Sequence, residues 1–225
     1  MAGGKKRRMS KAERCIVIVG GGGHAASVAG VAMACGVVLI GFVDPARAGE
    51  TVFGIPVFSD TDRFMPAEAD FAIAIGNNYL RERVAEELEA RIGPARFAKI
   101  AHPSAVIGEG ASIGPGTVVM PNATIGPLAE VGRHCIVNTN ASVDHETVMS
   151  DFSSVAPGVH TGGCVKIGAR SAIGIGAAVK HGVVLGADVV IGASSYVDKD
   201  IPDRTVAYGI PARIIRRREI DEGYL

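Results

Sequence analysis

Two acidic residues flank a histidine in the sequence, as Asp144, His145 and Glu146. An imidazole can be neutral near pH 7 and accept a proton, and neighbouring carboxylates can orient it. His145 is therefore a candidate general base. The alternative is a solvated histidine at a turn with no chemical role. The elements that position this segment decide between the two.

The segment lies within a strict six-residue repeat. Every sixth residue is Ile, Val or Leu, with Met149 and Thr161 as the exceptions, and the positions are Ile107, Ile113, Val119, Ile125, Val131, Val137, Val143, Met149, Val155, Thr161, Ile167, Ile173, Val179, Leu185, Ile191 and Val197. One short strand plus one tight turn accounts for a period of six, which neither a helix nor a strand alone explains. Three such units make a coil of about 18 residues, so we predict a parallel β-helix.

The repeat places His145, Gly163 and His181 in one column, because residues one coil apart lie above one another. At a strand spacing of about 4.8 Å, the two histidines would be roughly 10 Å apart, and we predict that they do not touch. Gly163 leaves a gap between them where a ligand can lie against the backbone. His160 is expected near the same wall. The remaining histidines of the repeats and His181 are expected to be structural or solvated: His102, His134 and His181.

A glycine-rich loop, Gly20 to Gly23, follows the apolar run 15–19 and precedes an Ala-rich segment that ends near Gly36. This strand–loop–helix pattern allows a phosphate to approach the backbone at a helix N-terminus. Asp44 ends the next predicted strand, 37–44, where a carboxylate can accept hydrogen bonds from a ribose or a base. The alternative is a tight turn without a ligand.

A second loop, Gly76-Asn77-Asn78, follows the third predicted strand, 70–75, and opens a helix over 77–93. Ligands bind at the carboxyl ends of the strands in open α/β sheets, so Asn77, Asn78 and Arg81 are candidates for contact with a sugar or phosphate. The alternative is capping of the helix and solvation at its surface.

Four regions follow from these patterns. We expect a disordered basic tail over 1–13, an α/β domain of the mononucleotide-binding (half-Rossmann) type over 14–100, a β-helix over 101–202 and a C-terminal tail over 203–225. The tail is expected to begin with a Gly-Ile-Pro turn and to end in a short helix. No loop interrupts the repeats, so the remaining walls of a site must come from the α/β domain and from neighbouring subunits.

Composition narrows the partners and the compartment. The formal net charge is +0 and Trp is absent, so neither nucleic acid nor a membrane is an expected partner. No secretory signal or membrane-spanning run is visible, and the predicted location is the cytoplasm. The cysteines lack a CxxC spacing and are expected to be buried and reduced: Cys15, Cys35, Cys135 and Cys164.

A zinc site is an alternative reading of the histidines, because trimeric β-helix carbonic anhydrases bind zinc through three histidines from adjoining subunits. Their HxxxxH ligand pair is missing, since Ser150 and Gly186 stand five residues after His145 and His181. We therefore predict no metal.

The chain resembles the bacterial nucleotide-aminosugar N-acetyltransferases of the bacillosamine and perosamine pathways and the related sialic-acid O-acetyltransferases. The resemblance covers nearly all of 15–215. It rests on the glycine loop with His24, on FVDP, AIGNN and VDHET, and on the closing YGIPAR.

The resemblance implies a homotrimer with active sites between subunits, a left-handed β-helix, and acetyl-CoA bound along its wall without a metal. It implies His145 as general base with Glu146 as its partner, a contact that requires a corner or a bent strand. Implied contacts to acetyl-CoA are Gly163, whose N–H meets the thioester carbonyl, Ile175, Ala193, Gly209 and Pro211. Implied contacts to the nucleotide sugar are Gly21, Gly22, Gly23, His24, Asp44, Asn77 and Asn78. A second histidine of some relatives is Ser154 here.

The predicted reaction is acetyl transfer from acetyl-CoA to the 4-amino group of a nucleotide-linked sugar. GDP-perosamine is favoured over UDP-linked 4-amino sugars, because Pro45 after Asp44 leaves room for a purine. The alternatives are O-acetylation of a sugar or sialic acid and a non-catalytic nucleotide-sugar-binding scaffold.

Overall fold

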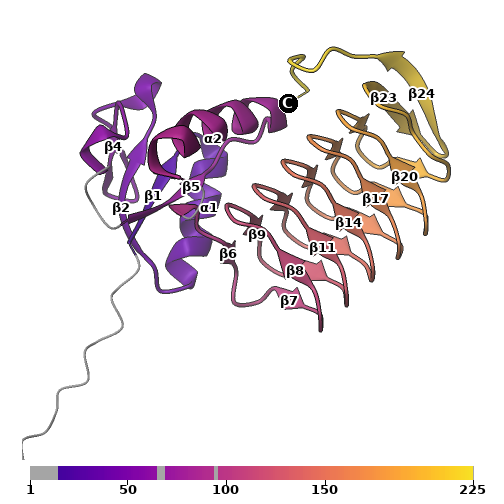
Figure 1. Cartoon of the computed structure of the whole chain (residues 1–225), viewed down its shortest axis with the longest axis horizontal. Helices are drawn as coiled ribbons and strands as arrows, with labels where there is room; N and C mark the ends of the chain where they lie inside the picture. The colour runs from indigo at the N-terminus through magenta and orange to yellow at the C-terminus, as the bar shows by residue number, and fades with distance from the viewer. Residues whose placement is uncertain (1–14, 65–68, 94–95, 225) are drawn as a thin grey trace, which may run out of the picture.

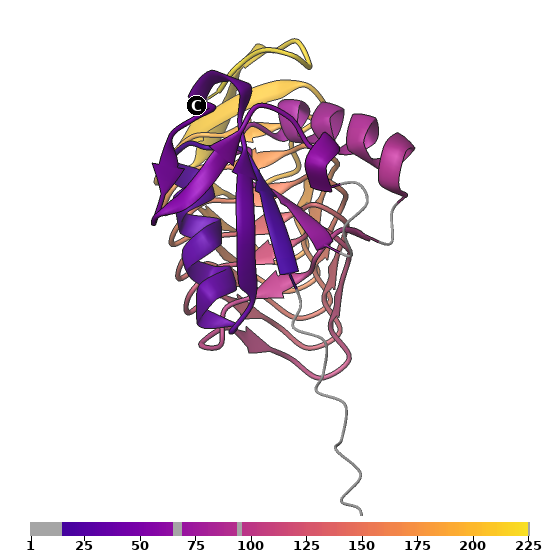
Figure 2. The same cartoon turned by 90° about the vertical axis from the view of Figure 1, so that its left-hand side faces the viewer.

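The computed structural model describes residues 15–64, 69–93 and 96–224, which form an α/β domain followed by a parallel β-helix (Figure 1). The predicted basic tail, 1–13, lies outside these residues. Figure 2, turned by 90°, shows the α/β domain in front of one side of the β-helix. No helix within the described residues is long and apolar enough to cross a membrane.

The α/β domain is built on a five-stranded sheet of order β3-β4-β2-β1-β5. All neighbours pair in parallel except the edge hairpin of β3 with β4. Its elements are β1 (Cys15–Val19), α1 (Gly23–Ala34), β2 (Val38–Val43), η1 (Pro45–Arg47), β3 (Thr51–Val52), β4 (Ile55–Phe58), η2 (Asp62–Phe64), β5 (Ala69–Ile73) and α2 (Asn78–Ile92). The helices agree closely with those expected over 23–36 and 77–93.

Strand β1 is apolar throughout because both of its faces are covered. Ile16 and Ile18 pack in a cluster with residues of α1, whereas Val17 and Val19 pack in a cluster with residues of α2. A strand buried on both faces needs a continuous apolar run rather than alternation. Helix α1 also contacts the β-helix, because Val28 shares its cluster with Val118.

The β-helix has three parallel sheets, with strands added in the order of the coils. One side consists of β7 (Val106–Ile107), β10 (Thr124–Ile125), β13 (Ser142–Val143), β16 (His160–Thr161), β19 (Ala178–Val179) and β22 (Tyr196–Val197). The next consists of β8 (Ser112–Ile113), β11 (Glu130–Val131), β14 (Val148–Met149), β17 (Lys166–Ile167) and β20 (Val184–Leu185). The third consists of β6 (Ile100–Ala101), β9 (Val118–Val119), β12 (Ile136–Val137), β15 (Ser154–Val155), β18 (Ala172–Ile173) and β21 (Val190–Ile191), and it continues into β23 and β24.

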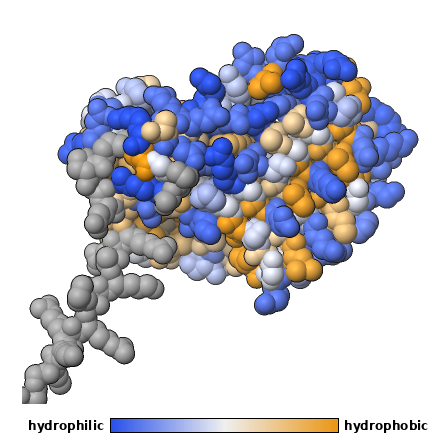
Figure 3. Space-filling view, in the orientation of Figure 1, coloured by the Kyte–Doolittle hydropathy of each residue, from blue (hydrophilic) through white to orange (hydrophobic). Residues whose placement is uncertain are grey.

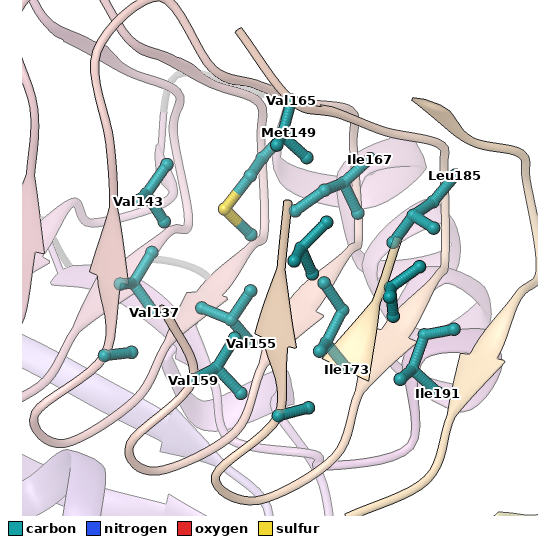
Figure 4. Packing of buried hydrophobic residues seen from close by; sticks show 14 of the residues in the cluster. Val137, Val143, Met149, Val155, Val159, Val165, Ile167, Ile173, Leu185 and Ile191 are labelled. Carbon is teal, nitrogen blue, oxygen red and sulfur yellow. The ribbon is translucent and has the colours of Figure 1, made fainter. Parts of the chain in front are cut away.

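The register agrees with the six-residue period. Ile125 pairs with Val143, one coil further on, and Val137 pairs with Val155. From Val119 to Val197 the aliphatic residues of the period point inward and form one continuous core, part of which is drawn in Figure 4. Fixed coil lengths therefore determine which side chains meet at the corners.

The C-terminal segment differs from the prediction of a tail with a short helix. It forms a hairpin of β23 (Thr205–Gly209) and β24 (Ala212–Arg217), with β23 parallel to β21. The chain then returns to the α/β domain, where Tyr224 Oη accepts a 2.8 Å hydrogen bond from the backbone N–H of Asn78. The prediction failed because the hairpin extends an existing sheet edge, which lies outside the period of six.

Candidate active site

His145 lies at the corner between β13 and β14, and its ring is held by the next residue. The backbone of Glu146 is left-handed at φ = 54°, which turns the two adjacent side chains toward each other. His145 Nδ1 lies 3.1 Å from Glu146 Oε2. A carboxylate can only accept, so a neutral imidazole donates from Nδ1 and presents a lone pair at Nε2. The predicted need for a corner is therefore met.

Gly163 lies directly beside Nε2 of this ring. A Cβ added at Gly163 would overlap His145 Nε2, so any side chain there would displace the imidazole. The His145 side chain is 45% exposed, which leaves the ring accessible from outside the chain. His145 thus faces backbone without a side chain at Gly163, as predicted from the alignment of residues one coil of 18 residues apart.

The prediction that His145 and His181 do not touch is wrong. Their ring centroids lie 6.0 Å apart, with the rings tilted at 45°. The estimate of roughly 10 Å applies to backbone two coils apart and ignores the direction of the side chains. Because Gly163 between them has no side chain, both rings occupy the space above it. His181 is therefore a neighbour of the base candidate.

The glycine loop and Asp44 meet at the carboxyl ends of β1 and β2. A Cβ on Gly21 would lie 2.9 Å from Asp44, and Arg47 contacts the carbonyl oxygen of Gly21. Gly22 and Gly23 have open space beside them. A cleft of about 370 Å³ lies at this sheet edge, and its lining includes Gly20, Asp44, Pro45, Ser59, Thr61 and Arg91. This edge is where open α/β sheets bind ligands.

A second cavity, of about 460 Å³, lies between the α/β domain and the β-helix. Its lining includes His24, Ser154, Ile175, Ala193 and Tyr224. Burial, with a smaller contribution from the Arg81 guanidinium, lowers the pKa of His24 to about 4. Its Nε2 is buried and has no protein partner in the described part of the chain. His24 thus offers a neutral imidazole to whatever enters this cavity.

The loop after β5 forms the junction between the two domains. Asn77 accepts a 3.0 Å hydrogen bond from the N–H of Leu80 and caps α2. Asn78 is fully buried, and its amide donates to Ser154 Oγ and to the carbonyl oxygens of Arg170 and Ser171. No group of Asn78 is free for a ligand, which contradicts its predicted contact with the nucleotide sugar.

Arg81 is also buried in this junction, which contradicts its predicted contact with a sugar or phosphate. Its guanidinium donates to the carbonyl oxygens of Ile75, His134 and Phe152 and to Asn78 Oδ1. Burial lowers the pKa of Arg81 to about 10, so the group remains cationic at neutral pH. The sequence placed these residues at the correct sheet edge, but a second domain covers that part of it.

The remaining predicted residues lie elsewhere on the β-helix. Gly209 and Pro211 flank Ile210 in the turn between β23 and β24, where Ile210 is 79% exposed. His160 Nδ1 lies 2.8 Å from Ser142 Oγ on the outer side of β13. His134 is buried and stacks on Phe152, in agreement with the predicted structural role.

Two contributors to these sites were missed in the sequence. Tyr224 closes the second cavity from the C-terminal end, and nothing in its local sequence indicates this return of the chain. Cys164 approaches Glu146, with Sγ 3.8 Å from Oε2. The six-residue period gives a signal for Cys164, because it stands one coil after Glu146 in the same column.

The predicted acetyl-CoA contacts do not converge within one chain. His145 and Gly163 lie at the corner that joins the side of β13 to the side of β14. Ile175 and Ala193 lie at a different corner, between β18 and β19 and between β21 and β22. The side formed by β7, β10, β13, β16, β19 and β22 separates the two corners.

Comparison with known families agrees with this architecture. Residues 15–88 match the PglD N-terminal domain, and residues 104–139 match the six-repeat bacterial transferase hexapeptide model. The predicted α/β domain followed by a left-handed hexapeptide β-helix is thereby confirmed.

Relatives match over most of their length. GDP-perosamine N-acetyltransferase of Escherichia coli O157:H7 is 33% identical over 184 residues, which cover 78% of this chain and 82% of that protein. A histidine-to-alanine variant of GDP-perosamine N-acetyltransferase from Caulobacter crescentus, solved with CoA and GDP-perosamine, has a TM-score of 0.85 at 32% identity and covers 89% of this chain and 96% of that one. The acetyltransferase domain of PglB from Neisseria gonorrhoeae, solved with acetyl coenzyme A, has a TM-score of 0.85 at 33% identity over 90% of this chain and 100% of that one. The chain therefore belongs to the hexapeptide-repeat family of nucleotide-aminosugar N-acetyltransferases that includes GDP-perosamine N-acetyltransferase.

Proposed function

We propose that this acetyltransferase moves the acetyl group of acetyl-CoA to the 4-amino group of a nucleotide-linked amino sugar, with GDP-perosamine as the favoured acceptor. The observation that carries the proposal is the geometry of His145. Its Nδ1 is 3.1 Å from Glu146 Oε2, and its Nε2 faces the bare backbone of Gly163. The relatives solved with CoA and GDP-perosamine support the choice of substrates.

The chemistry requires a base because a sugar ammonium has no lone pair. Once the amine is neutral, its nitrogen attacks the thioester carbonyl carbon, and His145 Nε2 accepts the proton that the nitrogen loses. The Glu146 carboxylate stabilises the imidazolium that results. The N–H of Gly163 would donate to the developing oxyanion. Collapse of the intermediate breaks the C–S bond, and the sulfur of CoA takes up the proton from His145.

The two cavities fit the two substrates. The cleft beside Asp44 lies at the sheet edge expected for the nucleotide of the acceptor, and Gly20 of the glycine loop lines it. Pro45 follows Asp44 and lines the same cleft. The second cavity, lined by His24, Ile175 and Ala193, would receive the sugar and part of the pantetheine arm.

A complete site then needs a second copy of the chain. The base at one corner and the predicted pantetheine contacts at another are separated by one side of the β-helix. Joining the first corner of one copy to the second corner of the next brings them together, and a head-to-tail contact of this kind closes into a ring of three copies when it repeats about a threefold axis. We infer the homotrimer that the family resemblance implies, with active sites between subunits.

The test is an acetyl-transfer assay that follows release of the CoA thiol with GDP-perosamine as acceptor. His145→Ala should lower kcat by about 10²–10⁴. Glu130→Ala, which removes an exposed carboxylate of strand β11 away from the His145 corner, is the matched control and should remain active. Near-full activity of His145→Ala would contradict the mechanism.

Paired acceptors separate the alternatives. Amino and hydroxy versions of the same nucleotide sugar distinguish N-acetylation from O-acetylation, since only the amine should react. If calorimetry detected a nucleotide sugar but no acetyl-CoA binding, the chain would instead be a binding scaffold.

A further inference from the structure

Two other metal-ligating side chains lie close to one oxygen of Glu146. Glu146 Oε2 lies 3.1 Å from His145 Nδ1 and 3.8 Å from Cys164 Sγ. All three ligand atoms lie within 4.8 Å of one another.

The fold itself brings the three groups together. Glu146 and Cys164 occupy equivalent corner positions of successive coils, and both have left-handed backbone, at φ = 54° and φ = 58°. The backbone N–H of Cys164 donates a 2.8 Å hydrogen bond to the carbonyl oxygen of His145, which locks the two corners in register. The side chains therefore leave the wall in parallel, and the cluster is held by backbone pairing rather than by flexible loops.

We propose that His145, Glu146 and Cys164 form a binding site for a thiophilic divalent cation such as Zn²⁺, and that occupancy inhibits acetyl transfer. Zinc takes imidazole nitrogen, carboxylate oxygen and thiolate sulfur in a tetrahedral arrangement. Zn–N and Zn–O distances of about 2.0 Å and a Zn–S distance of about 2.3 Å imply ligand separations of roughly 3.3–3.6 Å. The separations of 3.1 Å and 3.8 Å from Glu146 Oε2 are close to these values, all three ligand atoms lie within 4.8 Å of one another, and water would fill the fourth position.

The charges also suit a cation, because metal binding displaces the thiol proton of Cys164 and leaves a thiolate. The carboxylate and the thiolate together then balance the double positive charge. This donor set differs from the histidine pair that the carbonic-anhydrase comparison required.

Inhibition follows from the nitrogen that the metal would use. A cation on His145 Nδ1 leaves the ring proton on Nε2, which then has no lone pair for the amine of the acceptor. The same cation also removes Glu146 from the imidazole. This consequence rests on the proposed function of His145, whereas metal binding itself does not.

Cobalt binding tests the site without any assay of activity. Zn²⁺ is spectroscopically silent, but Co²⁺ bound by a thiolate has a sulfur-to-metal charge-transfer band in the near ultraviolet. The metal-free full-length protein should show this band on titration with Co²⁺, and Zn²⁺ should displace it. Cys164→Ser should lose the band and weaken binding by about 100-fold, because even a residue that only supports a ligand is typically worth 10–100-fold.

Cys35→Ser is the matched control, because Cys35 is an exposed cysteine in the α/β domain, which contradicts the prediction that all four cysteines are buried. It should leave the cobalt spectrum unchanged. Absence of a charge-transfer band in the unaltered protein, or an undiminished band in Cys164→Ser, would overturn the proposal.

Activity with and without Zn²⁺ then separates this proposal from the proposed function. Each variant is compared with itself, so the unaltered enzyme should be inhibited and Cys164→Ser should need roughly 100-fold more Zn²⁺. If the unaltered enzyme and Cys164→Ser were equally sensitive to Zn²⁺, the inhibitory metal site would be refuted, but the proposed acetyltransferase mechanism would not be affected. The opposite outcome is a cobalt band that requires Cys164 in a protein inactive on every amino-sugar nucleotide. It would support the metal site and contradict the proposed acetyltransferase function.

Discussion

The guanidinium of Arg81 on α2 donates a 2.8 Å hydrogen bond to the carbonyl oxygen of Phe152, at a corner of the β-helix. The same guanidinium reaches the carbonyl oxygen of His134, also 2.8 Å away. A single side chain of the α/β domain thus satisfies backbone acceptors in two coils of the β-helix. Two cross-domain ion pairs support this junction, Arg133 with Glu89 at 2.6 Å and Arg170 with Glu82 at 2.9 Å.

Replacing Arg81 should loosen this junction. Arg81→Ala leaves several buried carbonyl oxygens without a donor, and each unsatisfied group costs about 1–3 kcal/mol, so we expect a loss of about 3 kcal/mol or more in unfolding free energy. Chemical denaturation followed by circular dichroism measures it. Arg83→Ala on the same helix removes only an exposed pair with Glu86 and should change stability by less than about 0.5 kcal/mol. Similar losses in the two variants would refute this role of Arg81.

Stability should fall on mild acidification because of His134. Its ring is buried between Phe97 and Phe152, and burial, aided by Arg133 and Arg81, lowers its pKa from 6.5 to about 4. Between these values the unfolded chain binds a proton that the folded chain does not. The unfolding free energy therefore rises with pH across this window and falls as the pH drops from about 6.5 toward 4.

The full effect of His134 is about 3 kcal/mol, from roughly 1.4 kcal/mol per pKa unit. His24, with a pKa also lowered to about 4, adds to the same trend. Denaturation at a series of pH values measures the slope. His134→Phe keeps an aromatic ring in place and should flatten the curve; an unchanged slope would show that other groups dominate.

Glu146→Gln should impair catalysis without loss of fold. The amide can still accept from His145 Nδ1, but it carries no charge to stabilise the imidazolium. We expect kcat to fall by roughly 10-fold to 100-fold, less than the loss for His145→Ala. Steady-state kinetics with acetyl-CoA and GDP-perosamine check this, and Glu130→Gln serves as control. Unchanged kcat in Glu146→Gln would exclude the carboxylate from the mechanism.

Gly163→Ala should act through geometry alone. The new methyl would overlap His145 Nε2 and push the imidazole away from its place beside the backbone. A shift of about 1 Å at a reacting group can cost 10²-fold in rate, so we expect a loss of that size in kcat. Gly30→Ala, on helix α1 with open space beside it, should keep full activity and add up to about 1 kcal/mol of stability.

The period of six predicted the fold and the principal column because backbone pairing controls both. Once Ile125 pairs with Val143, the positions of His145 and Gly163 follow. The period did not predict that His181 approaches His145, since it describes strands and leaves the direction of the side chains undetermined. The 18-residue column predicts which residues are neighbours. The lack of a side chain at Gly163 determines how closely the rings of His145 and His181 approach each other.

The role of Asn78 and Arg81 could not be read from their own segment. A polar loop at the carboxyl end of a strand has the same sequence pattern whether it meets a ligand or a second domain. The later part of the chain determines whether the loop meets a ligand or a second domain. Here Phe152 and Tyr224 pack back against α2. Contacts between residues far apart in sequence carry no local signal.

A stack of identical coils has no intrinsic length, because the last coil presents the same bare strand edge as every coil before it. The hairpin of β23 and β24 removes this edge on one side of the stack, since β24 runs antiparallel to its neighbour. Its outer strand bears three exposed or partly exposed cations, Arg213, Arg216 and Arg217, and charged edge strands resist the addition of further strands. On this side of the stack, the hairpin thus opposes the addition of a further parallel coil from a second copy of the chain.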